Sequence, residues 1–220
     1  TNLYANPLLT AVYIGYDNGD YFLVSPLTKA TLRQSYHAPE QAKYVIRTLL
    51  EQAGEKRTHQ LLFYDQHLNR IEQRIDPDYV YDPRQRPWYN NALATTDVAI
   101  SKPYIYADTP LMGVTLSMRS SNPHAIVAMD LPLNGIKDAL QQLSITPHSQ
   151  IALVDSQGEV IGVNMGSAID QVTSTTQAPA LQHLENTALL QLWQLPSQTQ
   201  VMTYQTDDQQ WLGRKIELAQ

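Results

Sequence analysis

Two segments of the chain share a design that limits the fold more than any other feature of the sequence. "VYIGYDNGDYFLV" (12–24) and "IALVDSQGEVIGV" (151–163) each consist of an apolar run, a polar turn and a second apolar run. The turns at 17–20 and 155–158 contain Asp, Asn and Gly, which bond to their own backbone or adopt positive φ. Both segments therefore predict β-hairpins, and their recurrence far along the chain predicts two related α/β units in tandem.

Other apolar runs predict further strands. A looser hairpin, with Asp and Asn but no Gly in its turn, is expected at 61–71. The segment 43–52 is interpreted as a strand, although its periodicity fits a helix equally well. Additional strands are predicted at 112–120, 124–133, 200–207 and 210–218.

Helices are predicted from apolar spacing and from the positions of proline. In "LNGIKDALQQL" (133–143) the apolar residues recur at helical spacing, Asn134 is the expected N-cap, and Pro147 prevents continuation. A second helix is expected at 180–193, and the segment 164–182, rich in Thr, Ser, Ala and Gln, is expected to be a surface loop.

The end of the first of these helices sets the expected domain boundary. We place it after residue 143, so that residues 1–143 form one unit and residues 144–220 a second. The predicted fold class is α+β, with an antiparallel sheet and flanking helices in each unit.

Composition excludes several classes of function. The net charge of −6 and the pI of about 5.4 argue against nucleic-acid binding, and no basic cluster suggests a membrane surface. Cysteine is absent and the six histidines lack ligand spacing, so no metal site is expected. No Gly-rich phosphate loop or Gly-x-Ser-x-Gly motif appears, so no cofactor is expected and catalysis is only a minor alternative. Because the sequence starts without Met and has no long apolar run, we expect a soluble piece of a longer protein.

The stretch "YDPRQRPWY" (81–89) concentrates arginines, prolines and aromatic residues. One explanation is architectural: Pro87 fits the first turn of a helix over 88–93, Trp88 plugs the core and the arginines are solvated. The other is a binding site, because a guanidinium pairs well with a carboxylate or phosphate and an indole provides an apolar wall. The residues alone leave both explanations open.

The same stretch resembles the signature of double Cache sensor domains, the tandem PAS-like extracytoplasmic modules of bacterial transmembrane receptors. The resemblance continues in family order through "PLLTAVYIGYDNGDYFLVSPL" (7–27), "SKPYIYADTPLMGVTLSM" (101–118), "AIVAMDLPLNGIKDAL" (125–140) and "IALVDSQGEVIG" (151–162). It implies two tandem PAS-like units, with the long N-terminal helix of the family largely missing. The first unit would be membrane-distal and hold a ligand pocket, and the second would be membrane-proximal.

The resemblance also implies a set of ligand-binding residues. One subgroup of the family binds amino acids, and its carboxylate-binding and ammonium-binding positions match five aromatic or cationic residues and one acid of this chain. They are Tyr81, Arg86, Trp88, Tyr89, Tyr104 and Asp130. Where that subgroup has a further aspartate, this chain has Tyr106, and the nearest acid is Asp108. Half of the ammonium cage is therefore absent or displaced, and a simple carboxylate or another small metabolite is as plausible a ligand as an amino acid. Asp130 could instead be a strand-end or helix-capping acid.

The function implied is that of a sensor and not of an enzyme, although the full-length protein could carry a cyclase, phosphodiesterase or kinase. The domain would lie on the periplasmic or extracellular side of the inner membrane, anchored by helices outside this chain, and the full-length receptor could be a homodimer. A small ligand in the first unit would reshape the 101–118 strands and move the second unit. The alternative is a vestigial pocket, with signalling through dimerisation or a periplasmic protein partner.

Overall fold

The computed structural model describes residues 3, 6, 8–51, 57–164, 180–184, 186–196, 201–206 and 209–216. The chain divides into two compact units, Thr1–Gly135 and Ile136–Gln220. The division falls within the helix α4 (Leu133–Gln142). The assignment of residues 1–143 to a membrane-distal unit and of residues 144–220 to a membrane-proximal unit stays a prediction.

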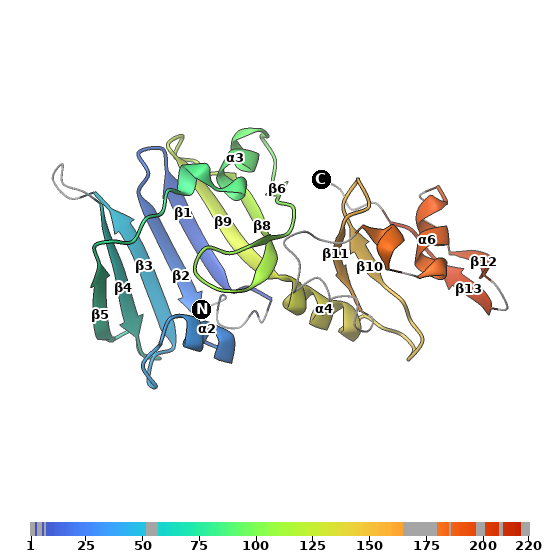
Figure 1. Ribbon diagram of the computed structural model, residues 1–220, viewed down its shortest axis with the longest axis horizontal. Helices are drawn as coiled ribbons and strands as arrows, with labels where there is room; N and C mark the ends of the chain where they lie inside the picture. The colour runs from blue at the N-terminus through green and yellow to red at the C-terminus, as the bar shows by residue number, and fades with distance from the viewer. Residues whose placement is uncertain are drawn as a thin grey trace. The chain divides into compact units, whose positions relative to one another are not determined.

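Unit 1 is built on one antiparallel sheet of nine strands (Figure 1). Eight of them follow the order β5-β4-β3-β2-β1-β9-β8-β6, and β7 pairs with β8. The strands are β1 (Ala11–Tyr16), β2 (Tyr21–Pro26), β3 (Tyr44–Leu50), β4 (Thr58–Tyr64), β5 (Arg70–Asp76), β6 (Ala99–Ile100), β7 (Tyr104–Ile105), β8 (Met112–Arg119) and β9 (Ala125–Pro132). The predicted strands of this unit are confirmed, including 43–52, where strand and helix periodicity competed.

The predicted turns form as their residues require. At the β1–β2 turn Gly19 has φ 94°, and the Asp20 amide donates to Asn18 Oδ1 at 2.9 Å. At the β4–β5 turn, which lacks glycine, Leu68 takes positive φ (64°) while Asp65 Oδ1 accepts the Asn69 amide at 2.9 Å. Asp and Asn side chains thus close the second turn without the conformational freedom that glycine gives the first.

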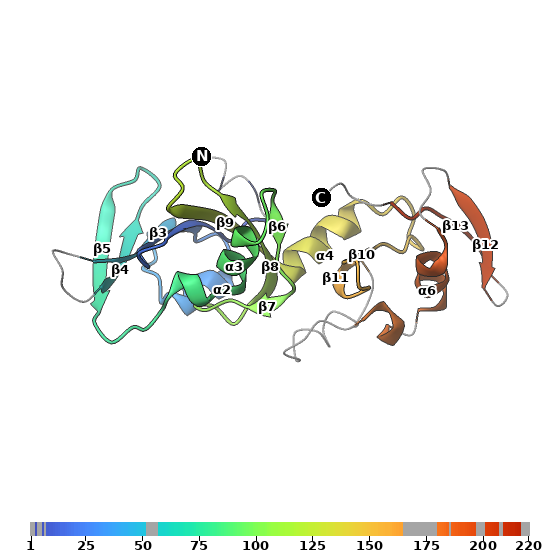
Figure 2. The same cartoon turned by 90° about the horizontal axis from the view of Figure 1, so that it is seen from above.

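One face of the sheet carries three helical segments of unit 1. They are α2 (Ala30–Ser35), the 3-10 turn η1 (Pro83–Gln85) and α3 (Pro87–Leu93). α2 buries Leu32 against Val45 and Phe63, and α3 buries Trp88 against Tyr13. Because Val45 and Tyr13 point to the same side of the sheet, α2 and α3 lie over one face, as Figure 2 shows from above. The sequence analysis predicted α3 but not α2.

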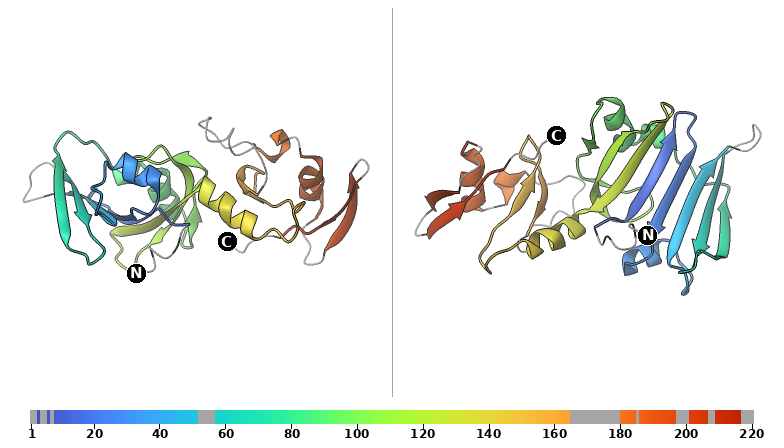
Figure 3. Two further views of the ribbon diagram at one scale, coloured as in Figure 1. Left: turned by 90° about the horizontal axis from the view of Figure 1, so that it is seen from below. Right: turned by 180° about the vertical axis from the view of Figure 1, so that it is seen from behind.

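The opposite face of the sheet is also apolar. A row of directly paired residues crosses six strands: Leu62, Ile46, Val24, Val12, Met129 and Leu116. All six are partly exposed, and among the described residues no helix lies over them in the view from behind (Figure 3). This second apolar face explains why the strands appear in the sequence as apolar runs instead of alternating apolar and polar residues.

Among its described residues, unit 2 contains two separate two-stranded sheets instead of the single sheet that was predicted. They are β10 (Ala152–Val154) with β11 (Val160–Val163), and β12 (Met202–Thr206) with β13 (Gln209–Gly213). The predicted hairpin at 151–163 is confirmed, with Gly158 at φ 81°. Among the described residues, no helix combines the length and hydropathy that a membrane span requires.

The helix predicted at 133–143 is confirmed as α4, whereas its predicted N-cap and the start of the helix predicted at 180–193 are wrong. α4 starts at Leu133, so Asn134 lies inside the helix and not at its N-cap. The helix expected at 180–193 is a 3-10 turn, η2 (Leu181–His183), followed by α6 (Thr187–Gln194). Asn186 caps α6 by accepting the Leu189 amide at 2.9 Å, which ends the earlier turn. The predicted loop at 164–182 lies largely outside the described residues.

Candidate ligand-binding cavity

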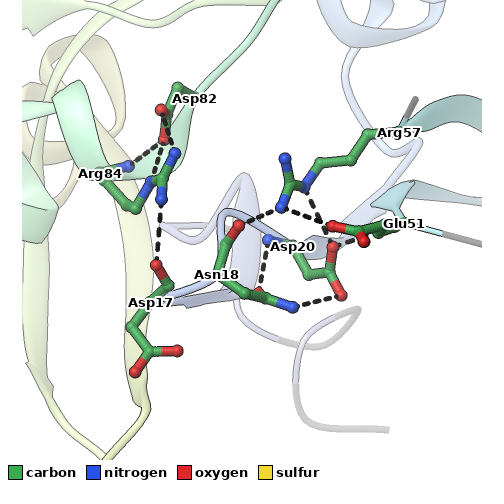
Figure 4. Close-up of polar contacts among 7 residues, drawn as sticks. All are labelled: Asp17, Asn18, Asp20, Glu51, Arg57, Asp82 and Arg84. Atoms are coloured by element: carbon green, nitrogen blue, oxygen red, sulfur yellow. Dashed lines mark hydrogen bonds and ion pairs between the residues drawn. The ribbon is translucent and has the colours of Figure 1, made fainter. Parts of the chain in front are cut away.

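The stretch 81–89 divides its two arginines between two tasks. Asp82 caps η1 by accepting the Arg84 amide at 3.0 Å, and its carboxylate pairs with the Arg84 guanidinium at 2.8 Å. Arg84 also donates to the Asp17 carbonyl at 3.1 Å, which fixes η1 to the β1–β2 turn (Figure 4). Arg84 is therefore an architectural residue, and Pro87 starts α3 as predicted, which leaves Arg86 between the two helical segments.

A neighbouring polar cluster holds the other side of the same turn. Arg57 donates to Asp20 Oδ1 at 3.2 Å, pairs with Glu51 at 3.2 Å and bonds the Asn18 carbonyl (Figure 4). The Asp17 carboxylate contacts His124 Nδ1 at 2.6 Å, so both acids of the turn have polar partners. These contacts keep the turn in place at one end of the sheet, and none of their residues lines the cavity described next.

A cavity opens between the sheet, α3 and the β7–β8 segment of unit 1. Its empty volume is about 270 Å³, part of which is open to solvent. It is lined by Tyr13, Tyr21, Leu23, Tyr81, Arg86, Trp88, Tyr104, Tyr106, Ala107, Asp108 and Asp130. Seven of the eight predicted site residues are thus brought together around one space. Tyr89 is not among the lining residues and is buried in the adjacent core.

Trp88 serves both the core and the cavity. Its side chain is 1% exposed and meets the Tyr13 ring edge-on at a centroid distance of 4.9 Å. α3 can approach β1 this closely because residue 15 is glycine: a Cβ there would lie 2.7 Å from the Trp88 ring and 3.0 Å from Pro83 Cβ. The architectural explanation and the binding-site explanation of Trp88 are therefore compatible.

Arg86 is the cationic group at the cavity. Its guanidinium lies over the rings of Tyr81 and Tyr104, with centroid distances of 6.0 and 5.5 Å. Among the described residues, its guanidinium forms one hydrogen bond, a long one of 3.5 Å to the Ile105 carbonyl. Within the part of the chain that the structure describes, Arg86 forms no ion pair. A guanidinium between two aromatic faces, with its strong donors unmatched, is suited to accept an anion.

Asp130 lies at the inner wall, in β9, and is 7% exposed. Its Oδ1 accepts two hydrogen bonds of 2.6 Å, from the Tyr13 hydroxyl and from Thr115 Oγ1. Thr115 also bonds the Tyr104 hydroxyl at 2.7 Å, so the network reaches the cavity surface. Burial raises the pKa of Asp130 to about 7. The two hydrogen bonds and the Arg86 charge lower this pKa, but their effect is smaller than that of burial.

Tyr106 stands where the resemblance led us to expect an acid. Its hydroxyl donates to the Val114 carbonyl at 3.0 Å, and its ring meets Tyr104 edge-on at 5.5 Å. The ring lies where a side chain of residue 113 would be, and a Cβ there would also lie 2.5 Å from the Leu131 carbonyl. Gly113 is therefore what allows Tyr106 to lie against β8.

Asp108 is held by residues that the sequence analysis did not single out. It forms an ion pair with Arg47 of β3, and its Oδ1 accepts from the Tyr79 hydroxyl at 2.5 Å. Arg47 is 1% exposed and lies over the Tyr21, Tyr79 and Tyr81 rings at 5.5, 4.6 and 5.1 Å. Alternation in β3 offered a clue, since Arg47 occupies an inward position. Asp108 lines the cavity, but its negative charge is paired with the buried Arg47 guanidinium.

His59 borders this cluster and stacks on Tyr79 at a centroid distance of 4.0 Å. It is 5% exposed, and neither ring nitrogen has a hydrogen-bond partner among the described residues. Burial, and after it the charge of Arg47, lowers the pKa of His59 to about 4. The imidazole therefore stays neutral beside the buried guanidinium.

Comparisons with known proteins relate the chain to bacterial signal transduction. No protein-family model matches it. It is 32% identical over 158 residues to adenylate cyclase 1 of Rhizobium meliloti, covering 71% of this chain and 24% of the cyclase. It is 32% identical over 66 residues to the methyl-accepting chemotaxis protein McpB of Bacillus subtilis, covering 30% of this chain and 10% of McpB. The chain thus spans about a quarter or less of the curated relatives it matches.

A solved structure gives a further similarity. The ligand-binding domain of the Campylobacter jejuni chemoreceptor Tlp3, in complex with L-valine, aligns with a TM-score of 0.46 at 12% identity. The alignment covers 93% of this chain and 60% of that one. The relatives are signal-transduction proteins, a cyclase and chemotaxis proteins, and the resemblance of this chain to the double Cache sensor domains of such proteins is confirmed.

Proposed function

We propose that this chain is the extracytoplasmic sensor domain of a larger membrane-anchored signalling protein. In this proposal unit 1 is membrane-distal and binds a small carboxylate-bearing molecule, either a simple acid or an amino acid. Unit 2 is membrane-proximal and relays the change to an output domain elsewhere in the protein. The relatives support both a cyclase and a chemotaxis output, and the chain itself does not favour one.

The observation that carries the proposal is the position of Arg86. A guanidinium at a small cavity, between two aromatic rings and without an ion-pair partner in the described chain, is suited to bind an anion. The cavity is small, which favours a molecule of a few heavy atoms. The predicted binding residues around Arg86 are Tyr81, Trp88, Tyr104, Tyr106, Asp108 and Asp130, and Tyr89 supports them from the core.

The test is thermal unfolding of the fragment against a panel of carboxylates, amino acids, amines, purines and sugars. A ligand at a hundred times its Kd should add about 2.7 kcal/mol of stability. Arg86→Ala should weaken binding of the hit by roughly 2 kcal/mol or more. Arg84→Ala is the matched control, because Arg84 lies two residues away but is paired with Asp82 outside the cavity.

Two outcomes would count against the proposal. Unchanged affinity in Arg86→Ala would remove the assignment of the anion site. No stabilisation by any compound would instead favour a vestigial pocket, with signalling through dimerisation or a protein partner. The apolar sheet face of unit 1 would then be the first surface to examine for such contacts.

A further inference from the structure

Three residues with full ionic charges in their ordinary states line the cavity: Arg86, Asp108 and Asp130. Their separate environments decide what charge the cavity presents to a ligand. The inference developed below rests on the proposed function, because it concerns the ligand class of the same cavity.

Asp108 offers little to a ligand ammonium. One of its oxygens is paired with the buried Arg47 guanidinium, and the other accepts the Tyr79 hydroxyl at 2.5 Å. The side chain of Asp108 is 17% exposed and that of Arg47 is 1% exposed. Detaching Asp108 would leave the Arg47 charge buried without its counterion, which is costly. The pair therefore contributes no net charge to the cavity.

Asp130 presents one oxygen with an unused position. Both of its side-chain hydrogen bonds end on Oδ1, and no donor among the described residues reaches Oδ2. No cation in the described chain forms an ion pair with this buried carboxyl group. An unpaired buried carboxylate is unfavourable, so the group retains a proton up to about pH 7. Since Oδ1 already accepts twice, the proton belongs on Oδ2, where it makes Asp130 a donor.

Burial outweighs the Arg86 charge and the hydrogen bonds from Tyr13 and Thr115, which lower the pKa of Asp130. The groups that face Asp130 are hydroxyls and one cation. They are the phenols of Tyr13, Tyr104, Tyr106 and Tyr21, the Thr115 hydroxyl and the Arg86 guanidinium. Burial raises the pKa of each of these tyrosines, so the phenols stay protonated at neutral pH. Below about pH 7 the cavity thus combines a guanidinium and a carboxylic acid proton with neutral hydroxyls, and the described residues that line it leave no carboxylate free for an ammonium.

We infer that the cavity selects a small monocarboxylate that lacks an amino group. Its carboxylate would pair with Arg86 and accept the Asp130 proton, and its short apolar chain would contact Trp88. An α-ammonium has three donors and finds in Asp130 only one free oxygen, which must first lose its proton. The ligand therefore carries one negative charge, the complement of Arg86, and not the balanced charges of an amino acid.

The experiment compares matched pairs that differ only in the amine: propionate with L-alanine, and 3-methylbutanoate with L-valine. Binding to the whole fragment is measured by titration calorimetry at pH 6 and pH 8. We expect the acid without an amine to bind at least 10-fold more tightly in each pair at pH 6. The protonated fraction of a group with pKa about 7 falls about 10-fold between these pH values. The affinity for the acid without an amine should therefore also fall about 10-fold between pH 6 and pH 8.

Asp130→Asn separates this inference from a general loss of binding. The asparagine amide can donate where the carboxyl proton did, so this variant should bind propionate about 10-fold more tightly than the parent at pH 8 and lose the pH dependence. Asp82→Asn, outside the cavity, should leave affinity and pH dependence unchanged. Tighter binding of L-alanine than of propionate, abolished by Asp130→Asn, would overturn the inference while keeping the proposed function. Binding of neither pair would overturn the inference, and no stabilisation by any compound of the panel would overturn the proposed function as well.

Discussion

Replacing Asp130 by asparagine should stabilise unit 1 at neutral and alkaline pH, although it removes a residue of the cavity. Burial raises the pKa of Asp130 from 3.8 to about 7. The unfolded chain loses this proton above about pH 4 and the folded chain only near pH 7. The free energy of unfolding of the parent therefore falls as pH rises through this interval, because the folded state binds the proton more tightly.

The magnitude follows from the difference of roughly three pKa units, each equivalent to about 1.4 kcal/mol. Ionisation of Asp130 thus costs the folded state up to about 4 kcal/mol above pH 7. Asparagine does not ionise, and its carbonyl can still accept from Tyr13 and Thr115. The gain from Asp130→Asn should be close to zero near pH 4 and grow towards this upper value at pH 8.

Urea unfolding followed by far-ultraviolet circular dichroism at pH 4.5, 6 and 8 measures the effect. Asp82→Asn provides a control of opposite sign, because hydrogen bonds from Arg84 lower the pKa of Asp82. The ionised Asp82 carboxylate stabilises the folded state at neutral pH, and this stabilisation is lost in acid. Asp82→Asn should therefore be less stable than the parent at pH 8. If Asp130→Asn changed stability equally at all three pH values, the carboxyl group would not carry the proton that the structure assigns to it.

Three further substitutions probe the packing around the cavity. Gly113→Ala should destabilise unit 1 by about 1–3 kcal/mol in urea unfolding, because the added Cβ would lie 2.5 Å from the Leu131 carbonyl. Gly135→Ala is the control and should not destabilise it, because the nearest atom to the added Cβ is 3.5 Å away. Arg47→Met should lower the free energy of unfolding by about 3–5 kcal/mol, because it leaves Asp108 unpaired, and adding Asp108→Asn should recover part of that loss. If the effects of the two substitutions were simply additive in the double mutant, the pairing would be contradicted. His59→Phe should stabilise unit 1 by about 1 kcal/mol or more, because two buried nitrogens without hydrogen-bond partners disappear. The parent should lose stability as the pH falls from 6.5 to 4, because the unfolded histidine takes up a proton before the folded one, and the variant should not. Thermal unfolding across this pH range would show the difference.

The fold of unit 1 could be predicted largely because its turns have unambiguous chemistry. The Asp17–Asp20 turn and the Asp65–Asn69 turn fixed two hairpins, and the pairing of their strands followed. α2 was missed because the segment 30–35 carries one buried apolar residue, Leu32, too few to produce a helical pattern. In unit 2, α6 starts after its N-cap Asn186. This start was not predicted, because the apolar pattern that indicates a helix already begins at residue 180.

The candidate site was predictable where the motif is local and not where the contacts are long-range. The stretch 81–89 placed Tyr81, Arg86 and Trp88 at the cavity, although it gave no means of telling Tyr89, which faces the core, from its neighbours. Arg47 precedes Asp108 by some sixty residues, and only the pairing of β3 within the sheet reveals that the two meet. A motif therefore identified one wall of the cavity, and the sheet supplied the others.

The position of Trp88 gives the protein a built-in optical reporter. Trp88 lines the cavity and touches Tyr13, while the two remaining tryptophans, Trp193 and Trp211, belong to unit 2. Replacing those two by phenylalanine leaves a single indole fluorophore, shielded from water and next to the proposed anion site. Its emission wavelength and its quenching would follow occupancy of the cavity directly, without a label, in the isolated fragment and in any longer form of the chain that carries no additional tryptophan.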